Sequence, residues 1–203
     1  MIVKVVALLL FYTACLGQEK KVEYYPNGKV RSQGSLLQDQ KEGRWEYYYP
    51  TGQQQAVEHF SKGRLDGKIV YYFPNGSIQG MENWEAGSLE DSAKYFYDDG
   101  ALEKAGMYSR SEYANEWQYF YKNGQIERIL HYKNGLPNGE VRMFSEKGIL
   151  VQEGFYQNGK EHGLWKFYSE EGVLNYSGEY SLGERTGEWF EYDKKGKRKV
   201  WKD

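Results

Sequence analysis

The chain has very little of the residue types on which metal and redox sites depend. Among its 203 residues there is one cysteine, Cys15, and there are three histidines, at positions 59, 131 and 162. A single cysteine excludes a disulfide within the chain, and so few ligands give no basis for a metal site. No metal ion or other cofactor is therefore expected, and stability must come from the packing of side chains.

Long runs of one charge are also scarce. The chain has 27 lysines and arginines against 29 aspartates and glutamates, a net charge of -2, and its one basic cluster is the final GKRKVWKD. A weakly acidic chain without a basic patch has little electrostatic affinity for polyanions. Neither nucleic acid nor an anionic bilayer is an expected partner.

One long apolar run stands at the beginning. Residues 1–17, MIVKVVALLLFYTACLG, have the layout of a secretory signal peptide, with an early lysine, an apolar stretch and then small residues. The stretch is too short to cross about 30 Å of hydrocarbon. The chain is therefore predicted to be exported, and to be periplasmic, secreted or lipid-anchored in the cell envelope.

Two cleavage sites compete. Cleavage after Gly17 would release residues 18–203, whereas a lipoprotein signal over residues 1–14 would leave a lipidated Cys15 at the new N-terminus. Lipoprotein signals usually carry leucine where this chain has Tyr12. Contact with a membrane is expected only through this lipid anchor, if Cys15 is modified.

Aromatic residues and glycine are abundant by contrast. There are 20 tyrosines, 9 phenylalanines, 6 tryptophans and 24 glycines. Glycine recurs every 24 residues, at positions 28, 52, 76, 100, 124, 148, 172 and 196. A fixed period of this length is the mark of a repeat architecture, with about eight units over residues 18–203.

The other positions of the repeat are equally regular. Units are counted from Gly43, Gly67, Asp91, Asn115, Gly139, Gly163 and Gly187. Position 6 is then always aromatic, positions 3 and 5 favour tryptophan and tyrosine, position 12 is mostly aliphatic, and position 18 is mostly aromatic.

Each unit has the features of a β-hairpin. Sequences such as PNG at 26–28 and KNG at 122–124 separate the two apolar runs and predict tight primed turns with positive φ at both central residues. A second set of glycines predicts return turns between units, and glycine at this frequency excludes helices. The predicted fold is all-β, an elongated single-layer antiparallel meander roughly 75 Å long.

The segments GRWEYYYPTG, NEWQYFYKNG and GLWKFYSEEG resemble the MORN repeat, in the bacterial variant found in proteins often labelled antitoxin-like. The resemblance runs from about residue 22 to 199. It implies a twisted sheet of stacked hairpins that contacts proteins or lipids and has no chemistry of its own.

Three positions depart from the pattern. Asp91 and Asn115 replace the glycine at position 1, where both residue types tolerate a left-handed backbone. Ser111 replaces a return-turn glycine, and the segment from 108 to 115 is therefore predicted to be an irregular turn that breaks the sheet's regularity.

No catalytic constellation is recognisable. There is no nucleophile in a strand-to-helix elbow and no phosphate-binding loop before a helix. His59 and His131 share one repeat position three units apart, which separates them by about 28 Å and prevents them from sharing a metal. We therefore predict a non-enzymatic protein without catalytic or metal-binding residues.

The aromatic rows suggest a contact surface. Positions 3 and 5 point to one face of a strand and position 6 to the other, so both faces carry rings. Most rings are expected to stabilise the sheet, but a single layer leaves surplus rings exposed, and exposed aromatic surface marks contact sites. The candidate surface consists of Trp45, Tyr47, Tyr71, Tyr95, Trp117, Tyr119, Trp165 and Phe167.

Several functions agree with these features. The first is a repeat scaffold of the bacterial envelope that mediates protein–protein interaction, as a monomer. The alternatives are an antitoxin or immunity protein that neutralises a toxin, implied by the resemblance alone, and a glycan or peptidoglycan binder, because aromatic rings stack on sugars. The sequence does not identify the partner.

Overall fold

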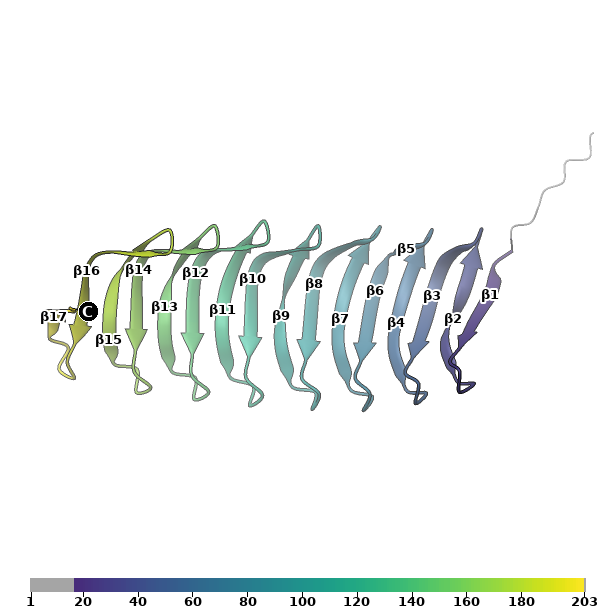
Figure 1. Cartoon of the computed structure of the whole chain (residues 1–203), viewed down its shortest axis with the longest axis horizontal. Coiled ribbons are helices and arrows are strands. Elements are labelled where there is room, and N and C mark those ends of the chain that lie inside the picture. Colours follow the sequence, from purple (N-terminus) through teal and green to yellow (C-terminus); the bar gives the residue numbers. More distant parts are fainter. Residues whose placement is uncertain (1–16, 203) are drawn as a thin grey trace, which may run out of the picture.

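In the computed structural model, residues 17–202 form one antiparallel sheet of seventeen strands. Figure 1 shows these strands side by side in chain order along an elongated molecule, with β1 at one end and β17 at the other. Within the described residues no helix is long and apolar enough to span a membrane. The predicted signal segment up to residue 16, with Cys15, lies outside the described residues.

The strands are β1 (Glu19–Tyr24), β2 (Val30–Leu37), β3 (Gln40–Tyr48), β4 (Gln54–Ser61), β5 (Arg64–Leu65), β6 (Gly67–Tyr72), β7 (Ile78–Glu85), β8 (Ser88–Phe96), β9 (Leu102–Ser109), β10 (Glu112–Phe120), β11 (Ile126–Lys133), β12 (Leu136–Phe144), β13 (Leu150–Gln157), β14 (Lys160–Tyr168), β15 (Leu174–Ser181), β16 (Glu184–Tyr192) and β17 (Arg198–Val200).

Consecutive strands pair antiparallel throughout, and β5 and β6, two parts of one strand, both pair with β4. Position 6 faces position 12 across each hairpin, as in the pair Phe120–Ile126. The predicted all-β meander of 24-residue hairpins is confirmed.

The turns inside the hairpins differ from the prediction. Gly28 has a φ of 81°, but Asn27 does not have a positive φ. The Gly28 N–H donates to the Tyr25 carbonyl (2.9 Å), and the Tyr25 N–H donates to the Lys29 carbonyl (2.8 Å). These are three-residue loops in which a β-turn is followed by a left-handed glycine, so the prediction of two-residue primed turns here was wrong.

The primed turns lie at the other ends of the strands, where they connect one hairpin unit to the next. Lys62 and Gly63, with φ values of 50° and 76°, are the two residues between the paired Ser61 and Arg64. The Gly63 N–H donates to the carbonyl of Lys41 in the neighbouring unit (2.9 Å), and the five return turns that follow along the chain repeat this bond. The length of each loop depends on which residues of the two flanking strands pair. An Asn-Gly sequence alone does not specify that pairing.

The predicted break at Ser111 is absent. Arg110 and Ser111 have φ values of 52° and 64°, the same left-handed conformation as the other return turns, and the Ser111 N–H donates to the Leu89 carbonyl (2.9 Å). The Ser111 hydroxyl also accepts the Leu89 N–H (3.0 Å). That local bond offsets the strain of a left-handed serine, so the turn stays regular and the expectation of irregularity was wrong.

Position 1 behaves as predicted. Asp91 and Asn115 have φ values of 62° and 57°, and Gly43, Gly163 and Gly187 are also left-handed. The pairing register shifts close to this position in each unit, so the residue marks a bulge that bends the strand.

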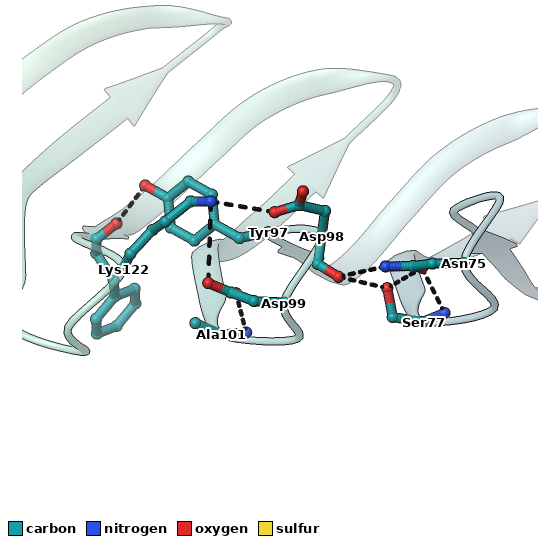
Figure 2. A network of polar contacts seen from close by, with 8 residues as sticks. Asn75, Ser77, Tyr97, Asp98, Asp99, Ala101 and Lys122 are labelled. Carbon is teal, nitrogen blue, oxygen red and sulfur yellow. Dashed lines mark hydrogen bonds and ion pairs between the residues drawn. The ribbon is translucent and has the colours of Figure 1, made fainter.

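The loops inside the hairpins are joined to one another along their edge of the sheet. Figure 2 shows the Asn75 side-chain amide donating to the Asp98 carbonyl (2.8 Å), while the Tyr97 hydroxyl donates to the carbonyl of Phe120 (2.8 Å). The ammonium of Lys122 lies 3.1 Å from Asp98 Oδ1. Each loop therefore holds the next in place.

The two faces of the sheet carry different side chains. The face with positions 3, 5, 16 and 18 is called the tryptophan face, and the face with positions 2, 4, 6 and 17 is called the opposite face. Trp45, Trp117, Trp165 and Trp189 at position 3 are all buried. The residue at position 16 of the preceding strand is then glycine, namely Gly34, Gly106, Gly154 and Gly178.

Glycine is required at position 16 because the indole ring lies directly over it. A Cβ atom added to Gly154 would overlap with Cδ2 and Cε2 of Trp165. Units with a larger residue at position 16 have a smaller residue at position 3, as in the pair of Leu130 and Val141. The indole N–H of Trp165 donates to the Phe155 carbonyl (3.2 Å), which fixes the ring.

The C-terminal end of the sheet is closed by the chain itself. The ring of Trp201 lies 6.1 Å from Trp189 and 5.3 Å from Tyr176. β17 pairs with only three residues of β16, and at the other end β1 exposes most of its charged side chains. Charged edge strands discourage pairing with a further strand.

Candidate functional site

The structure divides the predicted aromatic surface into two groups. Trp45, Trp117 and Trp165 are 2%, 0% and 1% exposed, so their indoles form the interior of the tryptophan face. The expectation that these rings line an open groove was wrong. In a single layer, an indole becomes buried when a glycine lies beneath it and rings from neighbouring strands lie beside it.

Those neighbouring rings come from position 18. The rings of Tyr156 and Tyr180 lie 5.2 and 5.9 Å from Trp165 in edge-to-face orientation. Edge-to-face pairs are favourable by about 0.5–1.5 kcal/mol each beyond the area they bury. The position 18 rings were visible in the sequence as a row, but their role as covers for the tryptophans depends on the strand register.

The second group remains accessible. Tyr47, Tyr71, Tyr95, Tyr119 and Phe167, all at position 5, are half-buried. The four tyrosines recur once per unit on the same face, two strand spacings or about 9.5 Å apart, and Phe167 follows two units after Tyr119 because Met143 is at position 5 of the unit between them. We call these five residues the ring row.

Carboxylates and neighbouring phenols hold the hydroxyl groups of the ring row. The Tyr95 hydroxyl donates to Glu82 (2.7 Å), and the hydroxyls of Tyr119 and Tyr132 lie 3.1 Å apart. Burial raises the pKa of Tyr95 above its usual value, and bonds to Tyr108 and Glu82 raise it further. Burial likewise raises the pKa of Tyr47 and Tyr71, so these hydroxyls stay protonated and can donate hydrogen bonds.

Cationic side chains of the chain itself lie on several rings. The ammonium of Lys41 is 4.7 Å from the centre of the Trp45 ring, and that of Lys104 is 4.6 Å from Tyr95. The guanidinium of Arg128 is 4.2 Å from Tyr119. The tryptophan face therefore combines ring surface with hydroxyl groups and charges of both signs, which suits a polar macromolecular partner better than a lipid tail.

Residues 17–202 contain no group of three histidine, cysteine, aspartate or glutamate side chains that could hold a metal ion. His59 and His131 each use Nδ1 to bond a backbone carbonyl, at 2.8 and 3.0 Å, which is a structural role.

Two exposed apolar residues on the opposite face were missed in the sequence. Phe155 and Leu164 are 39% and 51% exposed, and they line one surface depression together. The available signal was that the other residues at position 17 are mostly polar, with histidine at 59 and 131. An apolar residue at a polar repeat position is recognisable only once the face and exposure of that position are known.

Comparison with known proteins gives one family. The family model described as "MORN repeat variant" matches residues 20–37, 41–61, 65–86, 115–134, 137–158 and 161–181, more than half of the chain. The longest gap between matched segments, 87–114, contains Asp91 and Ser111, two of the departures from the repeat pattern. No curated protein matches the sequence.

Solved structures with partial similarity belong to much longer chains. Those titled "TcdB2-TccC3-Cdc42" and "TcdB2-TccC3" are 12% and 13% identical over 87% of this chain, with TM-scores of 0.20. A third, "TcdB2-TccC3 without hypervariable C-terminal region", is 14% identical with the same TM-score. The chain spans only 13–14% of the length of these proteins.

Proposed function

The chain belongs to the MORN repeat variant family, and from that premise we propose that it is a non-catalytic scaffold that binds another protein along its tryptophan face. The observation that carries the proposal is the ring row, five half-buried rings repeated at one position of an open sheet. Tyrosine combines a rigid apolar ring with a hydroxyl group and is enriched at protein interfaces.

The shape of the sheet supports the same proposal. A single layer offers its whole length to a partner, and repeat proteins use such extended surfaces for binding. The bonds between hairpin loops, the bonds between return turns and the indole bonds fix the backbone at both ends of the strands and in their centre. A rigid surface loses little conformational entropy when a partner binds.

Site-specific photocrosslinking in the native host tests the proposal. A benzophenone amino acid replaces Tyr71 or Tyr119 on the tryptophan face, and in matched controls it replaces the adjacent Tyr72 or Phe120, which point to the opposite face. We expect one protein to crosslink from Tyr71 and Tyr119 and not from the controls. Equal crosslinking from both faces, or none from Tyr71 and Tyr119, would refute the proposal.

Glycan binding is the second candidate, favoured by the exposed parts of the same rings, because tyrosine stacks on sugar rings. The assay that separates the two is retention on immobilised peptidoglycan. Glycan binding predicts retention of the wild type and loss of retention when Tyr71 and Tyr119 are changed to serine, with no protein crosslink.

We also propose that this scaffold works in the cell envelope, on the strength of the signal-like residues 1–17. The intact mass of protein purified from the envelope checks this. A chain beginning at Gln18 would be a released protein, and one beginning at Cys15 with acyl chains would be a lipoprotein. A full-length unmodified mass would contradict export.

A further inference from the structure

The apolar pair on the opposite face lies in a surface hollow. Phe155 in β13 is opposite Glu140 and His162, and Leu164 in β14 is opposite Glu179. Leu164 and Lys166 line two adjoining depressions, one shared with Phe155 and Arg142 and the other with Glu188 and Phe190. The pair is therefore the apolar centre of a continuous hollow across β12 to β16.

Phe155 lacks a hydrogen bond that side chains at the same repeat position make in other units. At the same repeat position, His59 and His131 bond the carbonyls of Lys68 and Glu140 at position 2 of the next strand. The corresponding Asn83 side chain donates to the Ser92 carbonyl in the same way. Phenylalanine has no polar side-chain atom for such a bond, so this unit exposes a ring where the units with His59, Asn83 and His131 stabilise the sheet.

The backbone below the hollow is fixed from the other face. The carbonyl of Phe155 accepts the indole N–H of Trp165, and that indole is almost completely buried. The Phe155 ring is thus presented from a rigid strand, which reduces the entropy lost on binding.

Cations and carboxylates both line the hollow, but in different places. Arg142 and Lys166 are opposite Glu153, and Arg198 lies over the Phe190 ring. Glu140 and Glu179, in contrast, are directly opposite Phe155 and Leu164. Glu140, Glu179 and Glu188 are exposed, and none of them has an ion-pair partner among residues 17–202. The nearest cation on β14, Lys166, is already paired with Glu153 (2.9 Å). Unpaired carboxylates lie on both sides of the apolar pair along the row at position 2.

We propose that the Phe155–Leu164 hollow is a docking site for a segment of a partner protein in which aliphatic side chains are flanked by lysine or arginine. The aliphatic side chains cover Phe155 and Leu164, and the basic side chains meet Glu140, Glu179 and Glu188. Anionic bilayers and nucleic acids are disfavoured by the same carboxylates. This surface lies opposite the ring row and is tested independently of the proposed function.

The test measures fluorescence anisotropy of a labelled peptide in which two leucines are flanked on each side by two lysines, with the protein from residue 18 to 203. The double variant Phe155→His, Leu164→Glu places at these positions the residues that His131 and Glu140 already supply in the preceding unit. Met107→His is the control, since Met107 is equally exposed at the same position two units away.

We expect the peptide to bind saturably to the wild type and to Met107→His. Its binding to the double variant should be at least tenfold weaker, with an unchanged melting temperature of the protein. Binding to the wild type should weaken at 0.5 M salt. A peptide with glutamate in place of lysine should bind at least tenfold more weakly. Equal binding by the double variant, or no saturable binding by the wild type up to 1 mM protein, would overturn the proposal. Self-association of the wild type that the double variant abolishes would also overturn it, by identifying a second copy as the occupant.

Discussion

Changing Gly154 to alanine should destabilise the sheet far more than a methyl group normally does. The added Cβ would overlap with three atoms of the Trp165 ring. That ring is 1% exposed and lies between Tyr156 and Tyr180, so it has no free space into which it can move.

Two effects contribute to the expected loss. Overpacking a rigid interior costs about 1–3 kcal/mol. Shifting the indole also weakens its bond to the Phe155 carbonyl, and such a bond contributes about 0.5–1.5 kcal/mol. Together they predict a decrease of about 2–4 kcal/mol in the free energy of unfolding, measured by urea denaturation with circular dichroism.

The repeat itself supplies a compensating change. The preceding unit has Leu130 at the position of Gly154 and Val141 at the position of Trp165. Trp165→Val alone should cost about 3–5 kcal/mol through the cavity that it leaves. Combined with Gly154→Leu, it should restore about 2 kcal/mol relative to the sum of the two single variants.

Gly80→Ala is the matched control. Its added Cβ lies 3.1 Å from the edge of Tyr95, a half-buried ring that can shift. We expect this substitution to lower the free energy of unfolding by less than about 1 kcal/mol. Alanine reduces the conformational entropy of the unfolded chain, and this stabilising effect offsets part of the strain. If Gly154→Ala were as stable as Gly80→Ala, or if the effects of the two single variants were additive, the glycine–tryptophan complementarity would be refuted.

Three further predictions follow from the turns and the opposite face. Because Asn115 has a φ of 57°, Asn115→Gly should leave thermal stability unchanged and Asn115→Val should cost about 1–2 kcal/mol. Ser111→Ala should cost about 1 kcal/mol and increase hydrogen exchange at the Leu89 amide, which loses its hydroxyl acceptor; unchanged exchange would contradict this. Hydrogen bonds from Tyr168 and Lys166 lower the pKa of Glu153 in the folded protein, so its stabilising contribution should be present at neutral pH and be lost as the pH falls from 4.5 through the lower folded value. Urea titrations of Glu153→Gln should therefore show a smaller loss of stability over that pH range than the wild type, and parallel curves would exclude the effect.

Much of the fold could be predicted because the 24-residue period constrains it. The positions of the strands and the left-handed Asp91 and Asn115 follow from residue types at fixed intervals. Local conformational preferences decide these features, so one sequence is enough to recognise them.

The turn types were not predictable in the same way. Asn-Gly is compatible with a primed turn and with a loop whose glycine alone is left-handed, and the choice depends on where the flanking strands pair. Ser111 shows the same limit, since its hydroxyl finds the Leu89 amide only after neighbouring return turns are stacked.

The candidate site was only partly predictable. The sequence correctly placed Trp165 and Phe167 on one face, but it could not show that Trp165 is buried and Phe167 is half-exposed. That difference arises because Trp165 lies over Gly154 on the preceding strand and has a ring at position 18 on each side. The register shift at the bulge brings these residues next to Trp165.

By itself, the sequence determined that the chain is a meander of hairpins with aromatic residues on both faces, because period, turn residues and side-chain alternation are local properties. Only the tertiary structure decided which rings are interior, which stay accessible, and that Phe155 and Leu164 form an apolar centre between carboxylates. Exposure depends on neighbours contributed by other strands, and these are set by register and bulges across the sheet.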